Sequence, residues 1–149
     1  MDYLEKVENL NKNINSKIYQ FHIFSNIIKT MNLSVLMSVY YKEKPEYLQQ
    51  ALESIWDKQT LKPDEIILVE DGKLTPELYQ IIEKWNKKIN GKLKRIPLQE
   101  NGGLAKALNT GIKHCSGEYI ARMDSDDICD PARFEKQIYF FQNNPDVDV

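Results

Sequence analysis

The acidic residues most able to do chemistry lie directly after two apolar segments that have the character of buried strands. Glu70 and Asp71 follow one segment, and Asp124, Asp126 and Asp127 follow the other. Parallel strands place their carboxyl ends at one edge of a sheet, where ligands bind, so we expect these groups to converge. An Asp-x-Asp pair at such an edge can hold Mg²⁺ or Mn²⁺ and leave coordination positions for water and phosphate oxygens.

The Asp-x-Asp motif alone does not separate a metal site from an ordinary acidic loop, but its place at a strand end favours the metal. Asp127 fits a turn equally well, and Asp130 fits a helix N-cap because Pro131 follows it. A calcium-binding loop is disfavoured. Ile128 stands where a further oxygen ligand is needed, and the loop lacks the required glycine and late glutamate.

A second candidate for anion binding is the Asn-Gly-Gly turn at 101–103, which precedes an expected helix. Its backbone N–H groups could approach a phosphate, although an ordinary strand-to-helix turn has the same sequence. Lys106, one turn into the helix, either reaches that anion or is solvated. His114, near the end of the helix, is better explained as a charge that complements the helix dipole.

These residues need elements to position them, and apolar periodicity predicts four strands that alternate with four helices. Pro45, Pro76 and Pro131 each suit a first helical turn. Trp56 and Trp85 lie on apolar helical stripes and are expected in the core. The expected strands are 33–40, 65–69, 93–98 and 118–123, and the expected helices are 45–56, 76–89, 104–114 and 131–143.

This alternation indicates an α/β domain with a Rossmann-like, mostly parallel central sheet and helices on both faces. Residues 1–32 contain no Gly or Pro and carry apolar residues at helical spacing. We expect them to form a helical extension that packs on the α/β part, 33–149, rather than on a partner helix or a membrane surface. The segment 146–149 resembles the start of a fifth strand, so we expect a longer chain and a sheet that is incomplete here.

The composition excludes several classes of protein. The 149 residues are 42% hydrophobic and 28% charged with a net charge of -2, which is typical of a globular chain and predicts no nucleic-acid partner. Apolar runs are far shorter than the ~20 residues that span a bilayer. Cys115 and Cys129 form neither a disulfide framework nor a thiolate metal site. Together with the absence of signal-peptide features, this favours the cytoplasm, or the inner face of the cell membrane.

Five segments resemble, in the same order, those of family 2 glycosyltransferases with the GT-A fold. The resemblance covers residues 33–149, which makes it more specific than any single motif. The segments are LMSVYYKE at 36–43, IILVEDG at 66–72, NGGLAKALNTG at 101–111, GEYIARMDSDD at 117–127 and DPARFE at 130–135.

The resemblance implies that a sugar is transferred, with inversion at its anomeric carbon, from a nucleotide diphosphate donor, which we expect to be a UDP-sugar. It implies Mn²⁺ or Mg²⁺ as the cofactor. The expected acceptor is a saccharide or lipid-linked saccharide of a surface polysaccharide such as capsule or O-antigen. In the family the general base would fall after Val149, so we expect this chain to carry the donor half and not to complete the transfer alone.

Other interpretations remain open at this point. The chain could be a non-catalytic nucleotide-binding or interaction module, it could associate with a membrane surface, and it could form a homo-oligomer. A phosphotransferase with an aspartate nucleophile is disfavoured, because it would need an aspartate after the first strand and the segment 38–43 has none.

Matched position by position, the resemblance gives roles to residues of this chain. Ser38 and Tyr40 would lie against the nucleoside and Asp71 would bond the base. Asp124 and Asp126 would hold the ribose and the metal, with Asp126 the stronger metal candidate. The full nucleotide-binding set is Ser38, Tyr40, Glu43, Asp71, Gly103, Lys106, Asp124 and Ser125, and the metal set is Asp124 and Asp126.

The sequence departs from the family pattern at two positions. Glu70 stands where aspartate is frequent, and Leu108 stands where many members carry an arginine near the phosphates. We expect Lys106 to substitute for that arginine.

Overall fold

The computed structural model describes residues 32–147. The helical extension expected at 1–32 therefore lies, apart from Asn32, outside the described residues and stays a prediction. The strands are β1 (Leu33–Val39), β2 (Glu65–Glu70), β3 (Leu93–Pro97) and β4 (Tyr119–Asp124). The helices are α2 (Pro45–Trp56), α3 (Pro76–Lys88), α4 (Leu104–Gly111) with the short 3₁₀ helix η1 (Ile112–His114), and α5 (Arg133–Asn143).

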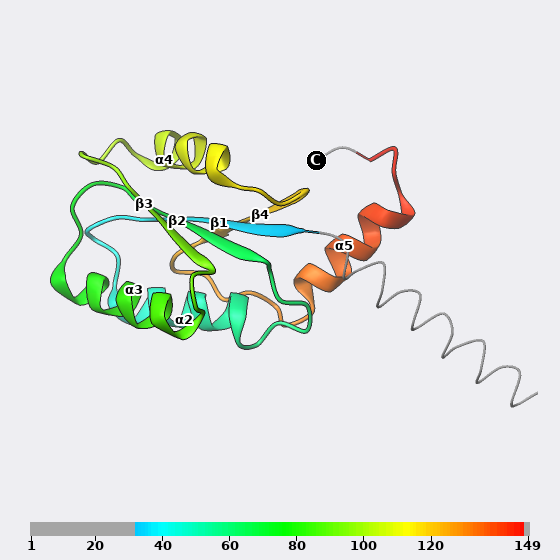
Figure 1. Cartoon of the computed structure of the whole chain (residues 1–149), viewed down its shortest axis with the longest axis horizontal. Helices are drawn as coiled ribbons and strands as arrows, with labels where there is room; N and C mark the ends of the chain where they lie inside the picture. The colour runs from blue at the N-terminus through cyan, green and yellow to red at the C-terminus, as the bar shows by residue number, and fades with distance from the viewer. Residues whose placement is uncertain (1–31, 148–149) are drawn as a thin grey trace, which may run out of the picture. The chain divides into compact units, whose positions relative to one another are not determined.

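The sheet is parallel throughout and has the strand order β3-β2-β1-β4. The chain moves outward from β1 to β3 and then crosses back to place β4 on the other side of β1 (Figure 1). Open α/β sheets bind ligands where the strand order reverses in this way, at the carboxyl ends of the strands. The register brings Ser38 of β1 level with Asp124 of β4. The predicted parallel α/β architecture is confirmed.

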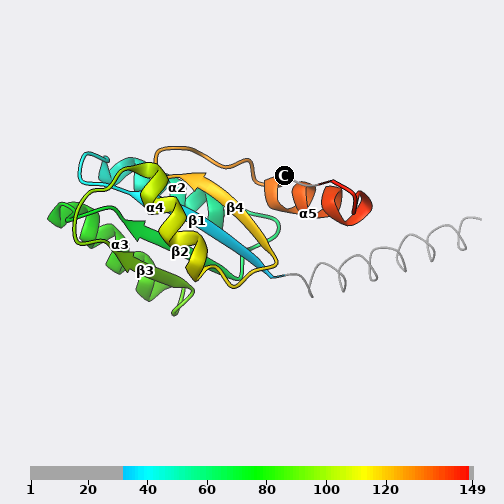
Figure 2. The same cartoon turned by 90° about the horizontal axis from the view of Figure 1, so that it is seen from above.

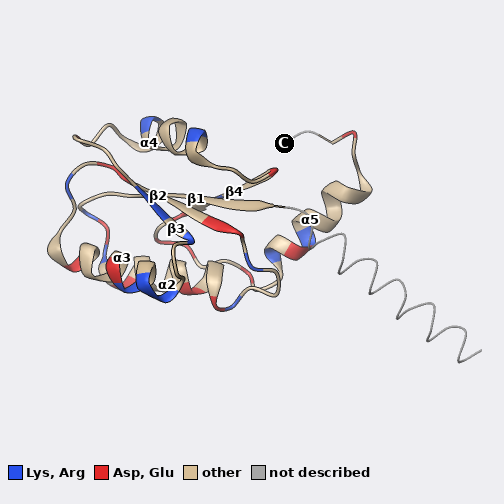
Figure 3. Ribbon diagram, in the orientation of Figure 1, with Lys and Arg blue, Asp and Glu red and all other residues tan. Residues whose placement is uncertain are grey.

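One face of the sheet is covered by α2 and α3 (Figure 1). Leu48 and Ile55 of α2 and Ile82 and Trp85 of α3 are buried, and so are all six residues of β2. The hydroxyl of Thr75 accepts a hydrogen bond from the backbone of the first turn and so caps α3. Acidic and basic segments alternate along the outer side of these two helices (Figure 3), which is typical of solvated helix faces.

The opposite face is covered by α4, which crosses over β1 and β2 (Figure 2). Leu36, Ile67, Val69 and Ala107 form a small apolar cluster there. Gly111 permits the close approach, because a Cβ atom at that position would lie 2.4 Å from Leu36 Cδ1. Helices on both faces of the sheet are thus confirmed.

Two helix predictions need correction. The helix expected at 131–143 begins at Arg133. The N–H of Thr60 bonds to the Pro131 carbonyl, which a helix starting at Pro131 would need for its own first turn. The segment expected as one helix, 104–114, divides into α4 and η1.

The two tryptophans also differ from each other. Trp85 is buried as predicted. Trp56, by contrast, is only partly buried, and the Lys62 ammonium lies 5.9 Å from the centre of its ring.

Candidate functional site

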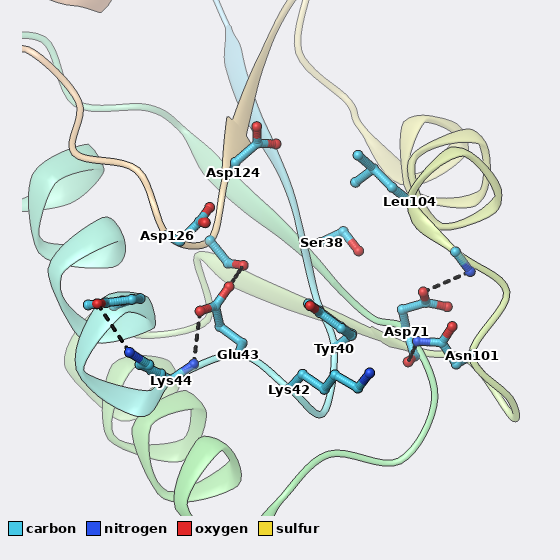
Figure 4. Close-up of a pocket in the computed structure, with 13 residues that line it drawn as sticks. Ser38, Tyr40, Lys42, Glu43, Lys44, Asp71, Asn101, Leu104, Asp124 and Asp126 are labelled. Carbon is cyan, nitrogen blue, oxygen red and sulfur yellow. Dashed lines mark hydrogen bonds between the residues drawn. The ribbon is translucent and has the colours of Figure 1, made fainter.

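A pocket of about 550 Å³ opens at the carboxyl ends of the strands (Figure 4). The loops after β1, β2 and β4 and the start of α4 supply its walls. Ser38 and Tyr40 of the β1 segment lie between a wall that carries Asp71 and a wall that carries Asp124 (Figure 4). The lining residues are Ser38, Tyr40, Lys42, Glu43, Lys44, Tyr47, Asp71, Asn101, Gly103, Leu104, Asp124, Ser125 and Asp126.

Most of the residues expected at the site line this pocket. Among the candidates, Lys106 does not: its Nζ lies 3.4 Å from Glu100 Oε1, on an exposed part of the surface. Neither Glu70 nor Asp127 lines the pocket. The candidates that line it are Ser38, Tyr40, Glu43, Asp71, Gly103, Asp124, Ser125 and Asp126.

The expected convergence of all the acidic residues is therefore wrong for Glu70 and Asp127. Adjacent residues of a strand face opposite sides of a sheet, and Glu70 points toward α3 while Asp71 faces the pocket. The Glu70 carboxylate accepts a hydrogen bond from Arg95 Nε, and Arg95 also pairs with Glu83. The bond to Glu70 raises the pKa of the Arg95 guanidinium above its ordinary value. Glu70 thus has a structural partner.

Asp71 connects the end of β2 to the start of α4. Its side chain is almost fully buried, and its two carboxylate oxygens accept hydrogen bonds from the N–H groups of Gly102 (2.8 Å) and Gly103 (3.0 Å). Gly103 adopts φ +84°, a conformation that favours glycine. The two N–H groups that the sequence offered to a phosphate are therefore already bonded to Asp71.

The Asp-x-Asp loop is anchored at its central residue. Ser125 is buried, with 6% of its surface exposed, and its hydroxyl donates a 2.6 Å hydrogen bond to Oε2 of Glu43. Oε1 of Glu43 accepts a 2.8 Å bond from the N–H of Lys44. Asp124 and Asp126, the residues on either side of Ser125, both line the pocket.

The two aspartates of the motif have different surroundings. Nη2 of Arg122 donates to both carboxylate oxygens of Asp124, at 2.7 and 3.0 Å. The Asp126 carboxylate has no hydrogen-bond or ion-pair partner within residues 32–147. Of the two aspartates, Asp126 is therefore the one whose charge has no partner in the described part of the chain.

Sequence reasoning missed three polar residues of the pocket: Lys42, Lys44 and Tyr47. The two lysines follow β1 at the same sheet edge as the aspartates, and Tyr47 lies in the first turn of α2. The Lys44 ammonium lies 4.8 Å from the centre of the Tyr47 ring. Proximity to a strand end was the signal that could have identified the lysines.

A divalent metal at this pocket would take few ligands from the described residues. Residues 32–147 contain no group of three or more His, Cys, Asp or Glu side chains arranged to hold a metal. Asp124 and Asp126 supply two carboxylates, and Mg²⁺ is commonly held by one or two carboxylates together with substrate phosphates and water.

A model of the family described as glycosyl transferase family 2 matches residues 34–149. The chain belongs to glycosyltransferase family 2. It is 49% identical over 114 residues to the amylovoran biosynthesis glycosyltransferase AmsE of Erwinia amylovora, a match that covers 76% of this chain and 42% of AmsE. It is 42% identical over 120 residues to the UDP-Gal:alpha-D-GlcNAc-diphosphoundecaprenol beta-1,3-galactosyltransferase of Escherichia coli. This second match covers 80% of the present chain and 42% of the galactosyltransferase.

Solved structures show the same fold. The crystal structure of S. aureus TarS 1–349 in complex with UDP matches with a TM-score of 0.66 and 30% identity, over 77% of this chain and 33% of TarS 1–349. The architecture is therefore the GT-A fold. This family 2 chain spans about 42% of the length of the curated relatives named above. Within residues 32–147, no helix combines the length and apolar character needed to cross a bilayer.

Proposed function

We propose that the protein transfers a sugar, with inversion, from a UDP-sugar to a saccharide or lipid-linked saccharide during synthesis of a surface polysaccharide. The observation that carries the proposal is the pocket at the strand switch, where Asp71 faces Asp124 and Asp126 across Ser38 and Tyr40. TarS binds UDP, the E. coli relative uses UDP-Gal and a diphosphoundecaprenol-linked acceptor, and AmsE acts in amylovoran biosynthesis. A lipid-linked acceptor would place the enzyme at the cytoplasmic face of the membrane.

In this proposal the nucleoside lies against Ser38 and Tyr40, and Asp71 accepts a hydrogen bond from the base. Each carboxylate oxygen of Asp71 accepts one hydrogen bond from a backbone N–H and keeps a further lone pair. An N–H group of the base can therefore donate a hydrogen bond to Asp71 without breaking either of the existing bonds. Asp71 would then connect the bound base to the start of α4.

The diphosphate would lie beside the Asp-x-Asp loop, with Mn²⁺ or Mg²⁺ held by Asp126 and Asp124. When bound, the metal would neutralise charge on the departing diphosphate. Lys42 and Lys44 line the same pocket and would add positive charge at its rim. We expect the general base that activates the acceptor hydroxyl to lie beyond Val149, because this chain spans less than half of its curated relatives.

Isothermal titration with UDP tests the donor half of the proposal. We expect binding in Mn²⁺ to be at least about tenfold tighter than in EDTA, because the metal joins carboxylate to diphosphate. Asp126→Asn should remove this difference. Asp127→Asn is the matched control, since it neutralises a carboxylate of the same loop that does not line the pocket. Equal affinity in Mn²⁺ and EDTA would contradict the metal role.

A transfer assay tests the activity itself. UDP-sugars are supplied to the full-length protein with a lipid-linked saccharide, and release of UDP is compared with formation of the extended saccharide. Metal-dependent UDP binding with no transfer from any UDP-sugar would instead support a non-catalytic nucleotide-binding module.

A further inference from the structure

A buried glutamine attaches the loop that follows the Asp-x-Asp motif to the carboxyl end of α2. Gln59 comes shortly after α2, and only 5% of its surface is exposed. Its Nε2 donates one hydrogen bond to the carbonyl of Ser54 (2.9 Å) and another to the carbonyl of Asp130 (2.8 Å). The side-chain amide therefore joins the end of α2 to a loop that lies 71 positions further along the chain.

Two more hydrogen bonds attach the same loop. Ser54 is fully buried, and its hydroxyl oxygen accepts a 3.0 Å bond from the N–H of Cys129. The N–H of Thr60 donates a 2.9 Å bond to the carbonyl of Pro131. Three consecutive residues of the loop are thus bonded to the end of α2 and to the residues that follow it. We call these contacts the α2 clamp.

The NH₂ group of Gln59 explains why an amide stands at this buried position. Its Oε1 is buried and has no hydrogen-bond partner within residues 32–147. A buried acceptor without a partner destabilises the folded protein, and an apolar side chain of similar size would avoid that cost. The compensating gain is the pair of carbonyls that Nε2 holds together.

The α2 clamp is one of two anchors of the Asp-x-Asp loop. The other is the bond from Ser125 to Glu43, a residue that precedes α2. Three exposed residues, 126–128, lie between Ser125 and Cys129. So short a segment between two fixed ends can follow few paths, so the position of Asp126 depends on both anchors.

We propose that Gln59 is a positioning residue for the donor site, which acts through the α2 clamp to hold the Asp-x-Asp loop where it binds a metal and a diphosphate together. Neither Gln59 nor Ser54 lines the pocket, so both would act through the loop and not by contact with the nucleotide. Binding sites lose affinity when their supporting residues allow shifts larger than about 0.5 Å. This inference rests on the proposed function, since it concerns metal-dependent binding of UDP.

The test compares UDP binding in Mn²⁺ and in EDTA by isothermal titration, well below the melting temperature of each variant. Gln59→Met keeps a side chain of similar length but removes both hydrogen bonds of Nε2. We expect the advantage of Mn²⁺ over EDTA to fall from at least about tenfold to less than about threefold. UDP affinity in EDTA should stay within about twofold of the wild-type value, because Ser38, Tyr40 and Asp71 lie outside the clamp.

Ser54→Ala is an independent variant of the same clamp. It removes the acceptor of the Cys129 N–H and leaves Gln59 in place. It should show the same selective loss in Mn²⁺, and it decides the question if Gln59→Met does not fold. Thr60→Ala is the matched control and should behave like the wild type. It removes the exposed bond from the Thr60 hydroxyl to Glu135 but keeps the backbone bond of the clamp.

A double variant tests whether the effect passes through the loop. Asp126→Asn is expected to remove the metal dependence by itself. In that background Gln59→Met should leave UDP affinity in Mn²⁺ unchanged, because the loop it positions no longer binds the metal. A further loss of affinity in the double variant would contradict action through the loop.

The outcomes separate this inference from the proposed function. A lower thermal midpoint with the full advantage of Mn²⁺ in both clamp variants would show that the clamp serves folding alone. An equal loss of UDP affinity in Mn²⁺ and in EDTA would show a general loosening of the domain. Either result overturns the role of Gln59 while the donor site stands. If the wild-type chain shows no Mn²⁺-dependent UDP binding, both proposals are overturned.

Discussion

Ser125 and Glu43 lie 82 positions apart in the chain, and a 2.6 Å hydrogen bond from the serine hydroxyl to the glutamate carboxylate joins them. The bond connects the loop after β4 to the loop after β1, two of the three strand-end loops that form the pocket. Because Ser125 is buried, the hydroxyl depends on this carboxylate for a partner. Glu43 therefore determines how the Asp-x-Asp loop is held.

Replacing Glu43 tests that dependence. Glu43→Ala should lower the free energy of unfolding by about 1–3 kcal/mol, because it leaves a buried hydroxyl without an acceptor. It should also weaken Mn²⁺-dependent UDP binding, since Asp124 and Asp126 lose their fixed position. Glu43→Gln keeps an acceptor oxygen and should behave much more like the wild type. Chemical denaturation and titration calorimetry provide the two measurements, and equal effects of the two substitutions would argue against the hydrogen bond as the cause.

Asp71→Asn should reduce both stability and nucleotide binding. The asparagine NH₂ group would face a glycine N–H where a carboxylate oxygen now accepts it, so we expect a loss of about 1.5–3 kcal/mol. UDP affinity should fall, because the start of α4 and the proposed base contact both depend on this carboxylate. Binding is compared well below the melting temperature of the variant, with and without Mn²⁺. Wild-type UDP affinity in a folded variant would remove Asp71 from the nucleoside site.

Glu65 should make stability depend on acid pH. Burial alone raises the pKa of its carboxyl, but hydrogen bonds from Lys94, Ser34 and Ser116 outweigh burial and lower the pKa from 4.5 to about 2. A depressed carboxyl pKa stabilises the folded state fully above the unfolded value, and this contribution is lost as the pH falls toward the folded value. Stability should therefore decline between about pH 4.5 and about pH 2.

Urea unfolding across this pH window checks the assignment to Glu65. Glu65→Gln should be less stable than the wild type at pH 7, because Lys94 and the buried serine hydroxyl lose a charged acceptor. Its stability should also fall less steeply with acid. Parallel pH profiles for the two proteins would show that other carboxyls cause the decline.

Gly111→Ala should destabilise the protein even though alanine is the better helix former. The added Cβ would lie 2.4 Å from Leu36 Cδ1 and 2.6 Å from Val69 Cγ2. Overpacking of this kind costs about 1–3 kcal/mol, which exceeds the gain of about 0.5–1 kcal/mol from removing a helical glycine. Asn109→Ala, on the exposed side of α4, is the control and should be neutral or slightly stabilising. Differential scanning calorimetry measures both variants.

The sequence was sufficient to locate the elements because their signals are local. Pro45 and Pro76 begin helices where expected, and the apolar runs that contain Val35 and Ile67 are central strands. The start of α5 could not be predicted, because a hydrogen bond from Thr60, far away in the chain, occupies the carbonyl of Pro131. Local signals do not report such long-range competition for a backbone group.

The residues of the site also divide into those that local sequence signals predicted and those whose placement depends on contacts with distant segments. The position of acidic residues at strand ends was a sufficient signal to predict that Asp71, Asp124 and Asp126 line one pocket. The sequence did not show that Glu70 would turn toward Arg95, because that depends on which face α3 covers. It also did not show that Lys106 would lie beside Glu100, since an exposed lysine side chain has many accessible conformations.

The spacing of the contacts that build the pocket has a consequence for how the protein folds. The bond between Asp71 and Gly102 joins residues 31 positions apart, whereas the bond between Ser125 and Glu43 joins residues 82 positions apart. Closing the longer segment costs more chain entropy, so we expect it to form later. During synthesis on the ribosome, the Asp71 wall can assemble while β4 is still inside the exit tunnel. The nascent domain would therefore acquire the Asp71 wall of the pocket before the Asp124 wall.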